Sequence, residues 1–165
     1  MIKLLLGLLF IKFEIFKNQC IYSLFIKKYK INNTFRFNGS NILFYGEGDI
    51  EIGHNSYIGE LSTIQAVKGF KVKIGSNCQI SHNVRIYTET DISNQDFSLD
   101  VRLTKKGNVI IGSYVWIGAN VLIVPGVVVG DNSIIGANSV VTKNIEENAI
   151  VGGVPARVLT KKNTQ

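Results

Sequence analysis

The stretch IGSYVWIGANVLIVPGVVVGDNSIIGANSVV, residues 111–141, repeats a unit of six residues without interruption. Each unit starts with an aliphatic residue, usually followed by Gly, and most units carry Asn or Gly three positions after the aliphatic residue. A unit this short cannot hold a pair of helices, but it can hold one short strand and one corner. The repeat therefore predicts a solenoid built from short strands.

The same unit extends upstream as far as Ile50. The aliphatic position is filled by Ile52, Ile58, Ile64, Ile74, Ile80, Ile86, Ile111, Ile117, Ile123, Val129, Ile135 and Val141. In residues 111–141 the side chain two positions before the aliphatic one is small, and alternate residues of a strand share a face, so both should point inward. Three units then close one triangular coil, and coils stack as neighbouring strands do.

The corners of the coil are predicted at the third position after each aliphatic residue. Asn and Gly tolerate the left-handed backbone that a tight corner requires. That position is occupied by Asn55, Asn77, Asn83, Asn120, Asn132, Asn138 and Asn144, and once by Gly126.

Two interruptions break the period, one at VKGFK, residues 67–71, and one at the longer segment 87–108. If both are inserts, the aliphatic residues form three stacks, one for each side of a triangular prism. The stacks contain Ile52, Ile74, Ile111 and Val129; Ile58, Ile80, Ile117 and Ile135; and Ile64, Ile86, Ile123 and Val141. Excursions from a rigid scaffold often carry function, so we expect the excursion loop 87–108 to matter.

The first residues of the chain differ from the repeat, because they are rich in Leu, Ile, Phe and Lys. They predict an amphipathic helical segment at residues 1–41, followed by the β-helix at 42–159 and a tail at 160–165. The longest uncharged apolar run, Leu4–Ile11, is too short to span a bilayer. Two roles stay open for the segment: packing on the domain as a cap, or contact with an anionic membrane face. The lysines that would reach lipid headgroups are Lys12, Lys17, Lys27, Lys28 and Lys30.

Composition narrows the class of protein. The chain has 165 residues with a formal charge of +6, and its two cysteines are too few and too far apart for a disulfide framework. These features fit one globular domain in a reducing compartment, which is typical of the cytoplasm. A basic chain suits phosphate-bearing ligands or membranes. Basic residues do not form a dense run interleaved with aromatic residues, which disfavours nucleic acid as a partner.

The repeat block, followed by GGVPARV at residues 152–158, resembles the hexapeptide-repeat acyltransferases, and within them the sugar O-acetyltransferases of galactosides, maltose and surface polysaccharides. The resemblance implies an all-β fold, the left-handed parallel β-helix. It also implies acetyl-CoA as the acyl donor without a metal, and a homotrimer with donor and acceptor in clefts between subunits. A γ-type carbonic anhydrase shares the fold but needs three zinc-binding histidines, whereas this chain has only His54 and His82.

Stacking places His82 in an outward corner column. The column consists of Glu60, His82, Ala119 and Ala137. Two alanines beyond His82 leave room along the corner for an extended pantetheine arm. The resemblance implies coenzyme A contacts at Ala119, Ala137, Thr142, Lys143 and Arg157. It also points to Trp116, which either stacks on a ligand or packs against a neighbouring subunit.

His82 is the candidate general base, since imidazole titrates near neutral pH. The resemblance places a catalytic histidine near Asp91, but residues 87–108 contain no histidine. Two hypotheses follow. Either His82 is the base and Glu89, Asp91 or Asp96 orients its ring, or Asp91 itself takes the position of the base. We favour the first, because a carboxylate with a pKa near ~3.9 is a weak base for a sugar hydroxyl. His54 is expected to be a turn residue, and Cys78 a core residue.

We therefore predict an acetyl-CoA-dependent O-acetyltransferase. Its acceptor would be a sugar hydroxyl in the synthesis of a surface polysaccharide, lipopolysaccharide or capsule, in the cytoplasm or at the inner face of the membrane. Two alternatives stay open: an N-acetyltransferase acting on an amino sugar or nucleotide amino sugar, and a non-catalytic β-helix that binds or scaffolds.

Overall fold

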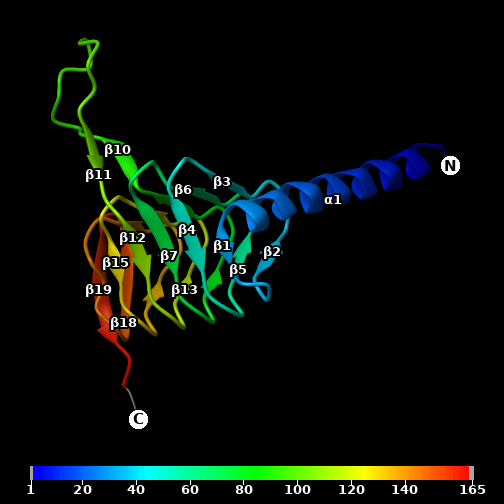
Figure 1. Ribbon diagram of the computed structural model, residues 1–165. Helices are drawn as coiled ribbons and strands as arrows, with labels where there is room; N and C mark the ends of the chain where they lie inside the picture. Colours follow the sequence, from blue (N-terminus) through cyan, green and yellow to red (C-terminus); the bar gives the residue numbers. More distant parts are fainter. Residues whose placement is uncertain (1, 164–165) are drawn as a thin grey trace.

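A computed structural model describes residues 2–163 and shows one helix followed by a β-solenoid (Figure 1). Helix α1 covers Ile2–Lys28. The first three coils contain β1 (Lys30–Ile31), β2 (Arg36–Asn38), β3 (Leu43–Tyr45), β4 (Asp49–Ile52), β5 (Tyr57–Gly59), β6 (Thr63–Gln65), β7 (Lys71–Ile74), β8 (Gln79–Ile80) and β9 (Arg85–Tyr87). The predicted fold class, a parallel β-helix with a helical N-terminal segment and an excursion, is confirmed.

The chain then leaves the prism and returns to complete it. The excursion contains β10 (Glu89–Asp91) and β11 (Thr104–Lys106). The last coils contain β12 (Val109–Ile111), β13 (Trp116–Ile117), β14 (Leu122–Ile123), β15 (Val128–Val129), β16 (Ile134–Ile135), β17 (Val140–Val141), β18 (Ala149–Gly153) and β19 (Ala156–Lys161). The predicted tail 160–165 thus begins inside β19, and its last two residues lie outside the described part of the chain.

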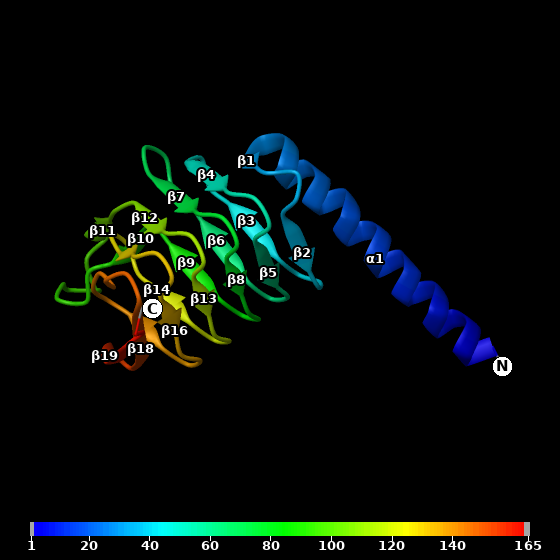
Figure 2. The ribbon, with the colours of Figure 1, turned by 90° about the horizontal axis from the view of Figure 1, so that it is seen from below.

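Three parallel sheets form the sides of the prism (Figures 1 and 2). We call them sheet A (β1, β4, β7, β12, β15), sheet B (β2, β5, β8, β13, β16, β18, with β19 antiparallel at its edge) and sheet C (β3, β6, β9, β14, β17). All three predicted aliphatic stacks are confirmed by the register; on sheet A, for example, Ile74 is paired with both Ile52 and Ile111. The two interruptions are therefore true inserts.

The interior of the prism is filled as the repeat predicts. Most of the largest fully buried side chains are isoleucines of the aliphatic position, such as Ile58, Ile80 and Ile117. Burying one aliphatic side chain contributes about 1.5–3 kcal/mol, so the stacked coils are stabilised mainly by contacts with their neighbours. The hydroxyls of the buried Ser133 and Ser139 donate hydrogen bonds to carbonyls within their own coils, at 2.8 and 2.6 Å.

The corners carry the left-handed backbone expected of Asn. Six of the predicted corner asparagines have φ between 54° and 60°, and Gly126 has φ 87°. Asn144 is the exception: in the last coil Asn148 has the left-handed backbone, with φ 61°, while the Asn144 side chain accepts a hydrogen bond from the Val128 N–H at 2.9 Å. The irregular C-terminal end of the prism, where Ile145 makes only an isolated bridge to Val129, accounts for this difference.

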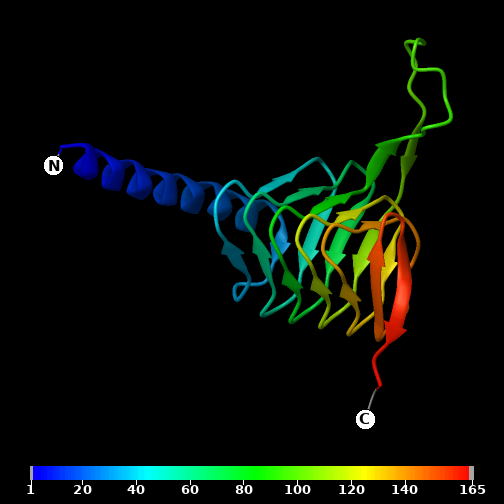
Figure 3. The same cartoon turned by 180° about the vertical axis from the view of Figure 1, so that it is seen from behind.

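Helix α1 covers the first coil with its C-terminal half only. Tyr22 stacks on Phe37 at 4.4 Å between ring centroids, and Phe25 stacks on Phe44 at 5.3 Å. The first coil begins at Lys30, so the β-helix extends upstream of residue 42 into the segment assigned to the N-terminus. The N-terminal half of α1 projects away from the prism (Figures 1 and 3). Within residues 2–163, none of the helical structure combines the length and apolarity needed to cross a membrane.

The excursion is an antiparallel hairpin that projects from one edge of the prism (Figure 3). It leaves after β9 of sheet C and returns before β12 of sheet A, so its base lies at the corner between sheets C and A. The backbone N–H of Gly107 donates to the carbonyl of Thr88 at 3.0 Å and closes this base.

Candidate active site

His82 lies at the corner between sheets B and C, between β8 and β9. Backbone hydrogen bonds link this corner from coil to coil: Asn83 N–H to Glu60 O at 2.8 Å, Asn120 N–H to His82 O at 3.0 Å, and Asn138 N–H to Ala119 O at 2.8 Å. The predicted column of Glu60, His82, Ala119 and Ala137 therefore exists in the structure.

The backbone at His82 is held firmly from below and from the side. Below it, a Cβ added to Gly59 would lie 2.8 Å from the His82 nitrogen, so glycine permits the close approach of the two coils. Beside it, the Asn83 side-chain amide donates to Asn120 Oδ1 at 2.9 Å, and the Asn120 amide donates to Asn138 Oδ1 at 3.0 Å. This amide ladder fixes the corner from which the imidazole projects.

The imidazole itself is open to solvent and has one acidic neighbour. The side chain of His82 is 63% exposed, and its Nδ1 lies 3.9 Å from Oε1 of Glu60. Such a pair attracts only when the ring is protonated, and it is weak where water surrounds both groups. On the other side the column continues with the methyl groups of Ala119 and Ala137, so the corner beyond the ring is unobstructed.

Glu60 is a neighbour that sequence reasoning did not assign to the site. Its signal was present, since Glu60 and His82 each follow their aliphatic residue by two positions in consecutive coils. The side-chain amide ladder was also missed, because Asn was considered only for its backbone freedom.

The structure does not bring the predicted carboxylates to His82. Asp91 and Asp96 belong to the hairpin, whose base lies at the C/A corner, whereas His82 lies at the B/C corner. The hypothesis that Glu89, Asp91 or Asp96 orients the His82 ring stays a prediction, because within one chain the acid beside the ring is Glu60. The chain crosses a whole side of the prism between the two corners.

Two of the hairpin carboxylates have local structural partners. Asp96 accepts hydrogen bonds from the backbone N–H and the hydroxyl of Ser98, at 2.8 and 2.7 Å, and these bonds lower the pKa of Asp96. Glu89 pairs with Lys106 at 3.0 Å, and hydrogen bonding to Lys106 lowers the pKa of Glu89. Asp91 lies on the exposed part of β10, opposite Thr104.

The residues proposed for coenzyme A lie in three places. Ala119 and Ala137 are at the B/C corner, and Trp116 is half exposed on the outer face of sheet B, in register with Gln79 and Ile134. Thr142 and Lys143 follow β17 at the C/A corner, and Arg157 is on β19. The structure thus brings Lys143 and Arg157 together but leaves Trp116 on another face.

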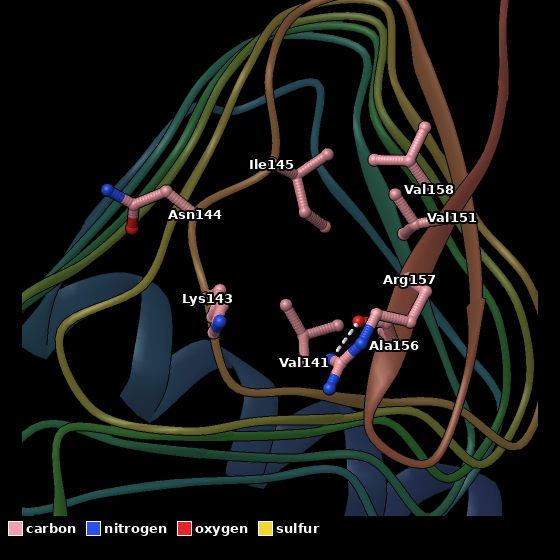
Figure 4. Close-up of a pocket in the computed structure, with 8 residues that line it drawn as sticks. All are labelled: Val141, Lys143, Asn144, Ile145, Val151, Ala156, Arg157 and Val158. Atoms are coloured by element: carbon pink, nitrogen blue, oxygen red, sulfur yellow. Dashed lines mark hydrogen bonds between the residues drawn. The ribbon is translucent and has the colours of Figure 1, made fainter.

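Lys143 and Arg157 line a cavity of about 140 Å³ at the C-terminal end of the prism (Figure 4). Its other lining residues are Val141, Asn144, Ile145, Val151, Ala156 and Val158. The guanidinium of Arg157 donates to the carbonyl of Ala156 at 3.0 Å, which keeps it at the rim. Two cations beside an apolar floor suit a ligand with phosphate groups and an apolar arm.

Neither His54 nor Cys78 competes with His82 for a chemical role. His54 stacks with Ser76, and its Nδ1 lies 2.9 Å from the Ser76 hydroxyl, as expected of a polar turn residue. The thiol of Cys78 is buried and donates to the Gly112 carbonyl at 3.0 Å. Burial raises the pKa of this thiol, so it is a poor nucleophile.

Comparison with known proteins is consistent with this geometry. The family model "Bacterial transferase hexapeptide (six repeats)" matches residues 108–143. Two curated proteins of Escherichia coli K12 are similar in sequence. The "Putative lipopolysaccharide biosynthesis O-acetyl transferase WbbJ" is 32% identical over 76% of this chain and 63% of its own length. A galactoside O-acetyltransferase is 41% identical over 72% of this chain and 57% of its own length. The chain thus spans less than two thirds of each of these curated relatives.

A solved structure gives the stronger match. A galactoside acetyltransferase in complex with coenzyme A superposes with a TM-score of 0.70 at 34% identity, over 86% of this chain and 70% of the other. The likeness covers most of both chains. The chain belongs to the hexapeptide-repeat acyltransferase family.

Proposed function

We propose that the protein transfers an acetyl group from acetyl-CoA to a hydroxyl of a saccharide. The observation that carries this proposal is an exposed imidazole, His82, held on a rigid corner beside Glu60 and below a column of alanines. Both curated relatives are named as O-acetyltransferases, and the matching structure was solved with coenzyme A. The relative named for lipopolysaccharide biosynthesis supports an acceptor in the assembly of a surface polysaccharide.

His82 is proposed as the general base. The ring nitrogen takes the proton of the acceptor hydroxyl as its oxygen attacks the thioester carbonyl, and a tetrahedral intermediate forms. The intermediate collapses when the carbon–sulfur bond breaks, and the imidazolium returns the proton to the leaving sulfur of coenzyme A. Glu60, 3.9 Å from Nδ1, carries a charge opposite to that of the imidazolium. No protein nucleophile is required by this route.

The donor is proposed to lie along the outer side of the last coil. Ala137 and Thr142 flank β17, so this strand connects the open B/C corner with Lys143. An extended ligand would place its reactive end toward the alanine column and its phosphates toward Lys143 and Arg157. In this arrangement Thr142 and Trp116 serve as further contacts, Trp116 from sheet B or from a neighbouring subunit.

The proposed working assembly is a homotrimer in the cytoplasm. The hairpin projects away from its own prism (Figure 1), and its base lies at the C/A corner, whereas His82 lies at the B/C corner. A hairpin of that shape is suited to contact a second copy, where Asp91 or Asp96 would meet the acceptor near His82 of the neighbour. Under this proposal each active site takes residues from two chains.

The first test measures release of coenzyme A from acetyl-CoA with a panel of sugar and amino-sugar acceptors. Replacing His82 by Ala should lower kcat by about 10²–10⁴-fold with a hydroxyl acceptor, because a positioned base is lost. His54→Ala is the matched control and should retain full activity, since His54 is a turn residue. Full activity in His82→Ala would rule out the proposed base.

The second arm tests whether the site is shared. His82→Ala and Asp91→Ala proteins are each assayed alone, then unfolded together, refolded and assayed as mixed assemblies. Recovery of activity in the mixture is expected, because some sites then combine an intact His82 with an intact Asp91 from another chain. Absence of recovery, with both variants trimeric, would contradict the shared site. A wild-type protein that neither binds coenzyme A nor turns over any acceptor would favour a scaffold.

A further inference from the structure

The N-terminal half of helix α1 exposes an unusual amount of apolar surface. Its first contacts with the prism are at Asn18 and Tyr22, where Asn18 Oδ1 accepts from the Asn41 N–H at 3.4 Å and the Tyr22 hydroxyl donates to the Gly39 carbonyl at 2.8 Å. Before these residues the helix projects freely (Figures 1 and 2). The apolar side chains of this free part, each 46–74% exposed, are Ile2, Leu4, Leu5, Leu6, Leu8, Leu9, Phe10, Ile11, Phe13, Ile15 and Phe16.

The apolar residues surround nearly the whole helix instead of forming one face. At ~3.6 residues per turn, Lys3, Gly7 and Glu14 fall on one narrow stripe, Lys12 lies on another side, and the remaining directions are apolar. A partner helix covers one stripe and leaves the other sides in water. A helix that is apolar all round is buried on all sides, in a protein core or in lipid.

Charge indicates which surroundings these are. Helix α1 carries five lysines and one glutamate, and that glutamate, Glu14, is paired with Lys17 at 2.6 Å. Lys27 and Lys28 lie in the last turn, next to the prism. Lysines at the base of an apolar helix are attracted to anionic headgroups, by about 1 kcal/mol for each residue near the surface.

Length agrees with entry from one side of a bilayer. Residues 2–16 rise about 22 Å at ~1.5 Å per residue, which is less than the hydrocarbon core of ~30 Å. Lys17 stands at the end of the apolar part, and the helix leads from there into the first coil.

We propose that residues 2–16 of α1 insert into an anionic bilayer as a monotopic anchor, with Lys17 at the level of the headgroups and Lys27 about 15 Å further along the helix, outside the bilayer on the side of the prism. The prism would then stand on the membrane by its first coil, with the Lys143 and Arg157 cavity at the opposite end. This proposal is independent of the acetyl-transfer reaction. It differs from attraction by lysines alone because burial of the apolar side chains provides most of the binding.

The test is sedimentation of the full-length protein with lipid vesicles. Wild type should bind vesicles of phosphatidylcholine mixed with phosphatidylglycerol, and bind pure phosphatidylcholine more weakly. The triple variant Leu5→Ser, Leu9→Ser, Phe13→Ser should lose about a thousandfold or more in partition coefficient, since each buried apolar side chain contributes more than a factor of ten. The control Leu24→Ser, Ile26→Ser replaces exposed apolar residues outside the free half and should bind as wild type does.

A second readout reports depth. Phe10→Trp in a Trp116→Phe background places one tryptophan in the free half, and lipids brominated on their acyl chains should quench its fluorescence. If brominated lipids quench the tryptophan fluorescence no more than lipids without bromine, insertion is ruled out. Unchanged binding of the triple variant would rule it out as well. A third outcome is that the wild type binds neither vesicle but forms assemblies, and that the triple variant does not form them. This result would show that other copies of the chain cover the helix. Turnover of a soluble acceptor by the triple variant keeps this result separate from the proposed activity.

Discussion

The corner between sheets B and C and the corner between sheets C and A are built from the same repeat but differ in regularity. The B/C corner repeats its unit in four successive coils, is tied by the amide ladder of Asn83, Asn120 and Asn138, and presents His82. The C/A corner is interrupted twice, carries the hairpin, and ends at Lys143. The regular corner can fix one side chain in place, whereas the irregular corner supplies reach and ligand contacts. Acetyl transfer as proposed needs both.

The largest expected effect in this comparison is at the end of the C/A corner. Replacing Lys143 and Arg157 together by Ala should raise the KM for acetyl-CoA about tenfold to a hundredfold for each cation, because hydrogen bonds to charged groups contribute about 1.5–3 kcal/mol. Effects on kcat should be smaller. Lys73→Ala on sheet A is the control, since Lys73 is exposed far from the cavity. An unchanged KM in the double variant would remove these two residues from the donor site.

Gly59→Ala tests how strongly activity depends on the position of the B/C corner, because Gly59 lies in the coil next to His82. The new Cβ would lie 2.8 Å from the His82 nitrogen, so the corner must shift. We expect kcat to fall about tenfold or more with little change in KM, together with a loss of about 1–3 kcal/mol in the free energy of unfolding. At Gly136, in the same corner of a later coil, a Cβ would come no closer than 3.4 Å to Val151 O, so Gly136→Ala is the stability control. Equal kcat in wild type and Gly59→Ala would show that His82 tolerates displacement.

The amide ladder should contribute to stability more than to activity. Asn120→Ala removes two hydrogen bonds of the ladder. It also places alanine, which adopts the left-handed backbone less readily than Asn, at φ 60°. We expect thermal unfolding to show a loss of about 1–3 kcal/mol. Asn120→Gly keeps the backbone freedom and should lose less, so the difference between the two variants separates the strain from the hydrogen bonds. Identical melting of all three proteins would mean that the ladder does not stabilise the prism.

The smallest expected effect concerns pH and the hairpin. Interactions lower the pKa values of Glu89 and Asp96 in the folded hairpin, so their contribution to its order is present above the unfolded pKa and is lost as pH falls through the folded values. Hydrogen exchange of residues 89–106 should therefore accelerate relative to the coils as the solution becomes acidic. Asp96→Asn should reduce this dependence. An equal response of hairpin and coils would contradict the assignment.

Most of the prism could be predicted from the sequence, because each coil buries the same types of residue at the same positions of the repeat. The register followed from counting six residues at a time, and the cores of the coils followed from the aliphatic position. The predicted β-helix starts at residue 42, inside the first coil, because Phe35, Ile42 and Phe44 replace the repeat there, and aromatic side chains of this coil meet Tyr22 and Phe25 of α1. The end of a solenoid must bury a different surface, so its sequence departs from the period.

The place of His82 in the coil stack could be predicted from the sequence, but the partner of its side chain could not. Stacking arithmetic placed His82 beneath Ala119 correctly, because backbone register alone decides that relation. It gave no account of Glu60 turning toward the ring, since side-chain direction depends on local rotamers. The role of the hairpin carboxylates stays a prediction, because the hairpin starts at another corner of the prism than His82 and would have to reach a site on a second chain.

The contacts of α1 with the first coil have a consequence for how the protein behaves at high concentration. A stack of parallel strands ends in unpaired backbone groups, which could template another coil and so extend into fibres. Here side chains of the helix occupy several of these groups: Tyr22 bonds both the Gly39 carbonyl and the Ile42 N–H, Asn18 accepts from Asn41, and Lys28 donates to the Gly46 carbonyl at 2.8 Å. At the other end β19 runs antiparallel along β18, in a direction that a further coil could not continue. Helix α1 at one end and β19 at the edge of sheet B at the other thus disfavour the addition of further coils to the prism.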